Sequence, residues 1–192
     1  MASTNNAASS RVVSYSVDSE DKILGVGDAW GEFAASNGEG DRLKPDSVVG
    51  KTLWDFVRGQ TLVELYRDIF GRVRDTGRPV RFDCRCDSPN FQRRMEMTVA
   101  HLGRGRLQLT SRTLSVIKQE KPLVAHAYDV GLSVLKRCSL CNLYELQCGD
   151  WTDASTAVEC DAVMDQQGRV QIAWTVCPPC RKDLVAMGTP TD

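Results

Sequence analysis

The fold class is decided by residues 61–87, which read TLVELYRDIFGRVRDTGRPVRFDCRCD. The apolar residues of 62–73 recur at the spacing of one helix face, and Thr61 with Glu64 has the form of a capping box. After Pro79 the period changes to two, which is typical of a strand with one apolar and one charged side. The stretch therefore predicts a long helix followed by a strand, and an α+β fold.

Further strands are expected on both sides of this stretch. A hairpin should precede it, and two more strands should follow, so that the order is two strands, a helical crossover and a three-strand meander. We expect a curved five-stranded antiparallel sheet with helices on one side. The expected elements are strands around 13–17, 23–26, 80–86, 94–99 and 107–116, a short helix capped by Asp28 and closed by Asn37-Gly38, and short helical turns within 48–56.

Two C-x-x-C pairs, Cys138 with Cys141 and Cys177 with Cys180, predict a metal site near the end of the chain. Two such pairs make a tetrahedral cage of four thiolates, and zinc takes four sulfur ligands at roughly 2.3 Å. A structural site of this kind leaves no coordination position open for water or substrate, so zinc would stabilise the fold and take no part in a reaction. The 35 residues between the pairs suit a zinc ribbon with strands inserted between its two knuckles. The alternative is that one or both pairs are dithiols that cycle to a disulfide.

The chain of 192 residues is long enough for an ordinary domain and a smaller metal-bound unit. We expect a disordered N-terminus over 1–11, a first unit over 12–118, a linker over 119–129, a zinc-ribbon-like unit over 130–188 and a flexible tail over 189–192. The apolar residues just before the first cysteine pair indicate that the two units are docked.

The net charge of −1 is unevenly divided along the chain. From Cys138 onwards there are eight acidic and three basic residues, a net charge of −5, so the preceding part carries +4. A tetrathiolate zinc site would add further negative charge to the acidic unit. Because such a unit repels phosphate, nucleic acid is disfavoured as its partner.

No apolar run approaches the roughly 18 residues of a membrane helix, and the first ten residues lack the blocks of a secretory signal. We therefore expect a soluble cytoplasmic protein that does not contact membranes. In a reducing compartment Cys84, Cys86, Cys148 and Cys160 are best interpreted as free thiols. For Cys84 and Cys86 the alternative is a site that binds a metal or senses an oxidant. For Cys148 and Cys160 the alternatives are exchange with the metal-ligating cysteines or a mutual disulfide.

Three segments carry a resemblance to a known family: ILGVGDAWGEF at 23–33, VGKTLWDF at 49–56 and LYRDIF at 65–70, the last followed by Val73, Arg74 and Gly77. With the expected element order, they resemble the PAS (Per-Arnt-Sim) sensory domains. The chain is also similar to bacterial stand-alone PAS proteins that carry RCDSP, here 85–89, then two arginines, here 93–94, and a C-terminal cysteine-pair module. The resemblance implies a small pocket between sheet and helices, and a sensory role.

The resemblance does not identify the ligand of that pocket. Flavin photosensors of the family carry an Asn-Cys-Arg motif after the region of Trp54, and this chain has none there. Haem-binding relatives usually supply a histidine from the long helix, and residues 61–76 contain no histidine. His101 is interpreted as a hydrogen-bonded structural residue, and His126 as a surface position on a helix or loop with only a weak claim as a metal ligand.

The sequence contains no catalytic carboxylate pair, no nucleophile with its base and no phosphate-binding glycine loop, so we expect no enzyme. The leading hypothesis is a sensory or regulatory module that binds a small ligand or a signalling partner, with zinc-ribbon docking and a homodimer as the expected contacts. The alternatives are a nucleic-acid-binding regulator that uses the ribbon, and a thiol redox sensor with a reactive Cys138 or Cys177.

Overall fold

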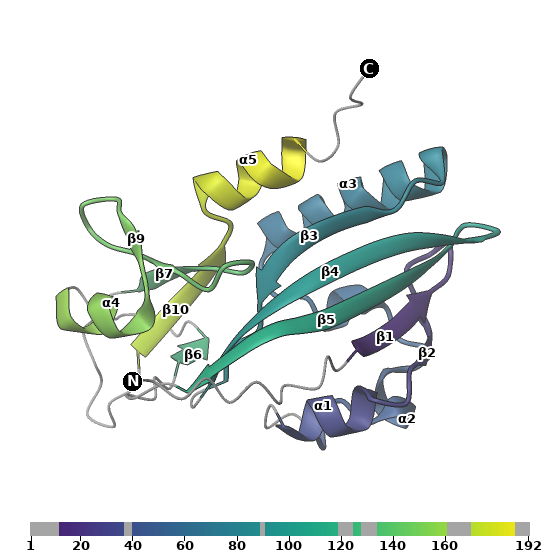
Figure 1. Cartoon of the computed structure of the whole chain (residues 1–192), viewed down its shortest axis with the longest axis horizontal. Helices are drawn as coiled ribbons and strands as arrows, with labels where there is room; N and C mark the ends of the chain where they lie inside the picture. The colour runs from purple at the N-terminus through teal and green to yellow at the C-terminus, as the bar shows by residue number, and fades with distance from the viewer. Residues whose placement is uncertain are drawn as a thin grey trace.

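The structure is a computed structural model, and it describes residues 12–36, 40–88, 91–118, 125–127, 134–160 and 170–186. Two five-stranded sheets and their helices make up these residues (Figure 1). The predicted α+β class is confirmed. Both expected termini, and Asn37-Gly38 at the end of the first helix, lie outside the described residues.

The first sheet is antiparallel, with the order β2-β1-β5-β4-β3. Its strands are β1 (Val12–Val17), β2 (Ile23–Val26), β3 (Val80–Arg85), β4 (Phe91–Gly103) and β5 (Arg106–Lys118). The predicted hairpin and three-strand meander are both present. β4 and β5 are longer than the alternating pattern indicated, because a bulge between Arg94 and Met95 shifts their register and breaks the alternation.

The helices of this unit lie between β2 and β3 in sequence. They are α1 (Trp30–Ser36), α2 (Pro45–Val48), the 3-10 turn η1 (Leu53–Asp55) and α3 (Gln60–Thr76). α3 packs on the sheet through Ile69, Phe70 and Val73, and the sheet meets it with Val99 and the two buried leucines of β5. The helical pattern that predicted α3 is thus the pattern of the core, since its apolar face is the buried face.

The predicted capping box at the start of α3 is wrong. The helix begins at Gln60, one residue before Thr61, and its N-cap is Gly59 with no side-chain cap hydrogen bond. Glu64 instead accepts a hydrogen bond from the side-chain amide of Gln60 (3.1 Å). Gly59 has a φ of 91°, a conformation that favours glycine, so the chain enters the helix through a glycine turn. The helix ends at Thr76, and its C-cap Gly77 has a left-handed φ of 68°.

Arg74, on the last turn of α3, joins three segments of the first unit. Its Nη2 donates to the carbonyl of Asp18 (2.8 Å) and to Oδ1 of Asp21 (2.6 Å), while its Nε donates to the carbonyl of Gly105 (2.9 Å). Both charged side chains are mostly buried. The β1–β2 turn and the β4–β5 turn are therefore fixed to the helix by one guanidinium, which suits a planar group with five donors.

The second sheet has the order β6-β10-β7-β8-β9 and mixes parallel and antiparallel pairs. Its elements are β6 (Ala125–Ala127), β7 (Leu135–Cys138), β8 (Tyr144–Glu145), β9 (Trp151–Thr152), α4 (Ala154–Cys160), β10 (Val170–Thr175) and α5 (Pro178–Ala186). β10 runs parallel to both β6 and β7. The alternating apolar residues Ile172 and Trp174 lie on β10, and Pro178 and Pro179 begin α5.

β6 falls within the stretch expected to be a linker. Its three residues pair with β10, and His126 lies opposite Gln171. The interpretation of His126 as a helix or loop position is therefore wrong. A strand of three residues is too short to show a period of its own, and its pairing is with a strand more than 40 residues later in the sequence.

The two units share one hydrophobic core, but the residues that make it are not the apolar ones before the first cysteine pair on which the expected docking rested, since Leu135 packs in a separate cluster. The members of the shared core from the second unit are Cys138, Leu140, Val176, Cys177 and Leu184, and they pack in the same cluster as Phe70 and Phe82 of the first unit. The N–H of Arg85, at the end of β3, donates to the carbonyl of Leu140 (2.6 Å), and Asn142 Nδ2 donates back to the carbonyl of Arg85 (3.1 Å). The edge strand of the first sheet thus ends in contact with the first cysteine pair.

The close approach of Gly59 to Trp174 leads to a prediction about the junction between the two units, which we call the joint. A Cβ at residue 59 would lie 3.0 Å from Cβ of Trp174 on β10 and would force a φ of 91° on an L-residue. We expect Gly59→Ala to lower the free energy of unfolding by about 1–3 kcal/mol in urea titrations, because it adds strain and a clash.

Gly71→Ala is the matched control, because Gly71 lies within the same helix and a Cβ there meets nothing within 4 Å. This change should raise stability by about 0.4–1 kcal/mol. If both substitutions had the same effect, the close contact between Gly59 and the second unit would be contradicted.

Candidate metal centre

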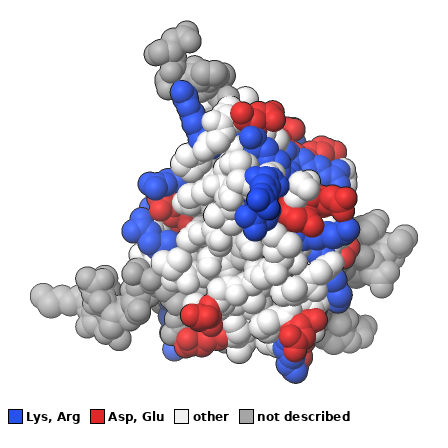
Figure 2. Space-filling model, turned by 90° about the vertical axis from the view of Figure 1, so that its right-hand side faces the viewer, with Lys and Arg blue, Asp and Glu red and all other residues white. Residues whose placement is uncertain are grey.

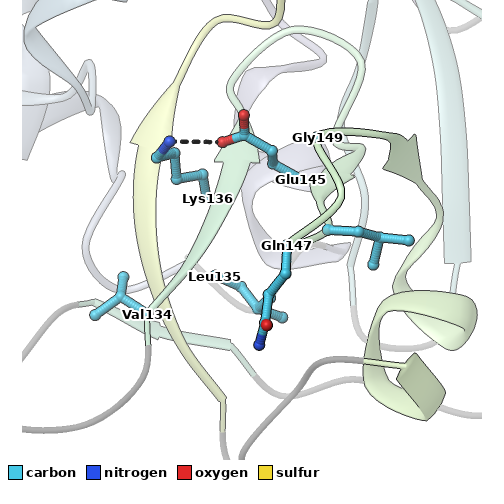
Figure 3. Close-up of a pocket in the computed structure, with 7 residues that line it drawn as sticks. Val134, Leu135, Lys136, Glu145, Gln147 and Gly149 are labelled. Carbon is cyan, nitrogen blue, oxygen red and sulfur yellow. Dashed lines mark ion pairs between the residues drawn. The ribbon is translucent and has the colours of Figure 1, made fainter.

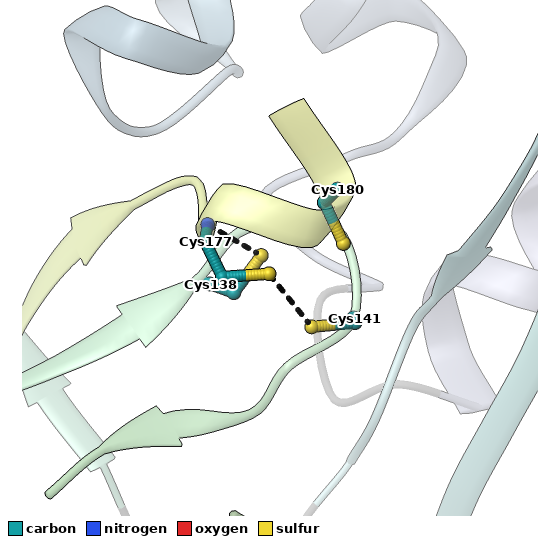
Figure 4. A group of neighbouring side chains, drawn as sticks. All are labelled: Cys138, Cys141, Cys177 and Cys180. Atoms are coloured by element: carbon teal, nitrogen blue, oxygen red, sulfur yellow. Dashed lines mark hydrogen bonds between the residues drawn. The ribbon is translucent and has the colours of Figure 1, made fainter. Parts of the chain in front are cut away.

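The first cysteine pair is held in a tight turn at the end of β7. The N–H of Cys138 donates to the carbonyl of Leu143 (2.8 Å), and the N–H of Asn142 donates to the carbonyl of Cys138 (3.0 Å). Asn142 closes the turn with a φ of 57°, a conformation that asparagine tolerates better than most residues. The turn directs the Cys138 and Cys141 side chains to the same side (Figure 4).

The second pair lies where β10 passes into α5. Pro178 and Pro179 occupy the first positions of the helix, where proline is favoured because no N–H is required there. The register of the parallel pair sets Thr175 opposite Cys138, and Ser139 N donates to the carbonyl of Thr175 (2.8 Å). Both cysteine pairs are therefore brought to one end of the same sheet.

The four sulfur atoms form a compact cluster. They lie within 4.8 Å of one another, and Sγ of Cys141 is 3.7 Å from Sγ of Cys177. Four sulfurs at roughly 2.3 Å from a central ion would be separated by about 3.8 Å, the edge of that tetrahedron. Cys138 and Cys177 are buried, whereas Cys141 and Cys180 are half-buried. The structure thus brings together all four predicted ligands at a spacing compatible with a bound metal such as zinc.

Hydrogen bonds distribute charge unequally within the cluster. The pKa of Cys138 is held well below its usual range, because the thiols of Cys141 and Cys180 donate to its sulfur and backbone N–H groups also reach it. The same interaction with Cys138 raises the pKa of Cys141 to about 12 and also raises the pKa of Cys180. Without a metal ion, these hydrogen bonds would therefore favour one thiolate in the cluster, at Cys138. A divalent cation is what allows four thiolates to coexist at this spacing.

Backbone donors support the buried sulfur of Cys138 from two directions. The N–H of Leu140 and the N–H of Cys177 each lie 3.4 Å from Sγ of Cys138, one from each cysteine pair. Such donors stabilise a thiolate ligand and fix its direction. The sequence showed the spacing of the cysteines but not these donors, which depend on how the two turns pack.

The other cysteines do not belong to the cluster. Burial raises the pKa of Cys84 to about 12, with Cys86 and Asp83 adding to the shift, and burial also raises the pKa of Cys86. These shifts agree with the interpretation of both as buried thiols and disfavour oxidant sensing, which needs a thiolate. Cys148 and Cys160 are exposed free thiols, and Sγ of Cys148 lies 3.5 Å from Oδ2 of Asp150.

The interior of the first unit contains polar groups among aromatic rings. Burial raises the pKa of both Tyr15 and Tyr66, and each phenol interacts electrostatically with Cys84. Tyr15 contacts Trp30 edge-on, with ring centroids 5.6 Å apart, and Tyr66 contacts Phe82 at 6.0 Å. The three titratable groups come from β1, α3 and β3, so they converge between the sheet and its helix. These three groups were not expected from the sequence to form a site, although a tyrosine on an otherwise apolar face is a signal for one.

Two cavities lie near the second unit. One, of about 290 Å³, lies between β3, β4 and α5, and its lining residues are Arg81, Phe82, Asp83, Glu96, Leu140, Cys180, Asp183 and Leu184. This cavity gives solvent a route to one of the four cysteines. The other, of about 260 Å³, lies beside β7 and β8, where Lys136 and Glu145 form an ion pair of 2.7 Å (Figure 3). Its lining contains none of the predicted metal ligands.

Comparison with known proteins gives distant structural likenesses. No family model matches the chain, and no curated protein matches it. The crystal structure of a domain of an HTR-like protein from Haloarcula marismortui matches with 17% identity and a TM-score of 0.38, covering 54% of this chain and 98% of that domain. A likeness this distant carries no functional conclusion. Within the described residues, no helix is long and apolar enough to cross a membrane.

The geometry predicts one tightly bound metal ion per chain. We expect Cys177→Ser to lose the ion and to remove a large part of the stability that it provides, because structural metals in small units contribute roughly 10 kcal/mol. Elemental analysis of untreated protein and denaturant titration measure the two effects.

Cys148→Ser is the control, since Cys148 is exposed and lies outside the cluster. It should retain both metal and stability. Equal metal content in wild type and Cys177→Ser would contradict the four-sulfur site.

Proposed function

We propose that this chain is a non-enzymatic sensory or regulatory module with a zinc-stabilised second unit. The PAS-like first unit takes a small ligand in its interior, and the second unit presents a docking surface for a protein partner. The observation that carries this proposal is the position of β3. Cys84 on this strand faces the interior tyrosines, and the next residue, Arg85, is hydrogen-bonded to Leu140 of the first cysteine pair.

β3 gives a short physical route from ligand to docking surface. A ligand that moves the inner side of β3 also moves the carbonyl and N–H of Arg85, both of which are bonded to the second unit. Because the cysteine cluster packs in the shared core, the second unit cannot shift independently of the strand. We infer that the signal leaves through a change in this joint, which a partner or a second copy of the chain would read.

Zinc is the metal that we propose for the cluster. The spacing of the sulfurs fits a single ion with four thiolate ligands, and this ligand set is typical of structural zinc. With four protein ligands no coordination position remains for substrate, so the ion would hold the fold rather than take part in a reaction. Iron would fit the same four sulfurs, but it would colour the protein, whereas zinc would not.

The interior favours a small ligand with an apolar body and a hydrogen-bonding group. Tyr15 and Tyr66 supply hydroxyl groups, and the rings of Trp30 and Phe82 supply apolar surface. The long helix α3 contains no histidine for a haem iron. The proposal therefore concerns an organic ligand other than haem.

The two alternative functions are less well supported. Nucleic-acid binding would require a field of positive charge, but the face in Figure 2 shows basic and acidic side chains intermingled around an uncharged centre. The second unit is acidic as well. A thiol redox sensor would require an accessible, reactive thiolate at Cys138 or Cys177, but both of these cysteines are buried. The low pKa of Cys138 arises from hydrogen bonds made largely by the other cysteines of the cluster, which are the groups that would share a metal ion with it.

The proposal predicts that the purified protein carries a small molecule in its interior. Cys84→Phe should reduce its amount strongly, because Cys84 packs against the same core cluster as Tyr15 and Tyr66, and a phenyl group there would compete with a ligand for volume. Mass spectrometry of the compounds released on denaturation, scaled to protein and metal content, measures the effect. Cys148→Phe, at an exposed position, should leave it unchanged.

Wild-type protein that releases no small molecule, and that remains monomeric without binding a partner, would contradict a sensory function.

A further inference from the structure

Arg137 lies in the middle of β7 with an aromatic residue on each neighbouring strand. The register sets it opposite Trp174 of β10 on one side and Tyr144 of β8 on the other. Its guanidinium carbon is 5.0 Å from the centre of the Trp174 ring and 5.5 Å from that of the Tyr144 ring. Two cation–π contacts hold the planar group in one orientation, so its remaining hydrogen-bond donors have a fixed direction.

One donor of this guanidinium is buried without a hydrogen-bond partner among the described residues. Nε of Arg137 is buried and makes no hydrogen bond, and across the described residues the structure gives this side chain no ion pair. Other arginines of similar exposure behave differently, since Arg74 and Arg85 each pair with a carboxylate at 2.6 Å. A half-buried cation without an anion is costly, because burial removes water without supplying a substitute.

Arginines of the first unit add positive charge near Arg137. We call this part of the junction between the units the seam, and its residues are Arg85, Asp87, Arg93, Arg137 and Tyr144. The N–H of Cys86 donates to the carbonyl of Arg93 (2.9 Å), and the N–H of Arg85 donates to the carbonyl of Leu140 (2.6 Å), in the turn that follows β7. Burial raises the pKa of Cys86 and of Tyr144; the positive charges of Arg93 and Arg137 oppose the first shift, and those of Arg137 and Arg85 oppose the second. Arginines of β3, β4 and β7 therefore all contribute positive charge to this seam.

The carboxylate at this seam is already engaged. Oδ2 of Asp87 accepts from Nη2 of Arg85 (2.6 Å), and Oδ1 accepts from the backbone N–H of Arg93 (3.1 Å). It is also nearly buried, with its side chain 8% exposed, so it has little freedom to turn elsewhere. Asp87 orders the arginines around it but does not supply an anion for Arg137.

We propose that this seam is a binding site for the oxyanion of a small molecule, a phosphate or carboxylate group, with Arg137 as the principal ligand. The fork of a guanidinium matches two oxygens of either group, and the aromatic clamp has already removed the rotational freedom that binding would otherwise cost. Arg85 and Arg93 add positive charge nearby, through their electrostatic action on Tyr144 and Cys86 respectively. The site is distinct from both the metal cluster and the tyrosine-lined interior, and it does not depend on the proposed sensory function.

The test uses the metal-loaded full-length chain with inorganic phosphate and with acetate as probes. Each is titrated against sodium chloride at matched ionic strength, and binding is followed by calorimetry and by the shift in Tm. We expect saturable binding of at least one probe. Phosphate alone would indicate a phosphate group, and binding of both probes would extend the site to carboxylates.

Two substitutions separate a specific site from general charge. Arg137→Lys keeps the charge but loses the fork, and Arg137→Met removes both, so we expect the dissociation constant to rise about tenfold in the first and more in the second. Arg112→Met is the matched control, because Arg112 is an exposed arginine whose partner is Glu96 (3.1 Å), and it should bind as wild type does.

Metal content confirms that each variant is folded, and Arg137→Lys keeps the test valid if Arg137→Met does not fold. Absence of binding to either probe beyond the chloride control would overturn the proposal. So would wild-type affinity in Arg137→Lys.

Discussion

The structure depends on four sulfur atoms that lie within 4.8 Å of one another where the two sheets meet. Thiolates at that spacing repel one another unless a cation lies between them, so the arrangement is stable as a metal site and weak without one. The cluster is also part of the shared core, because Cys138 and Cys177 pack with residues of the first unit. Whatever holds the sulfurs together therefore also holds the second unit against the first sheet.

The edge strand β3 makes two kinds of contact, one with the interior of the first unit and one with the second unit. Its inner side helps to line the interior through Phe82 and Cys84, and its end is hydrogen-bonded to the first cysteine pair through Arg85. A strand with both contacts links events in the interior to the position of the second unit. Arg137 directly precedes Cys138 of the cluster, so an oxyanion bound to it would also act on the joint.

Much of the fold could be predicted from the sequence, because α3, β3 and the opening hairpin show their own period over many residues. The four cysteines of the cluster could be predicted from their spacing alone. The start of α3 could not, because Gly59 is fixed by a turn and by Trp174, which lies far away in the sequence. The same holds for β6, whose three residues are a strand only because β10 pairs with them. Arg137 was missed since its partners are cross-strand neighbours, and register is not visible in composition or spacing.

We propose that one zinc ion joins these four sulfurs, and X-ray absorption at the zinc edge of the untreated protein is the decisive measurement. We expect a single shell of four sulfur atoms at about 2.3 Å. A shell containing nitrogen or oxygen, or metal-free protein whose late cysteines are joined in disulfides, would contradict it.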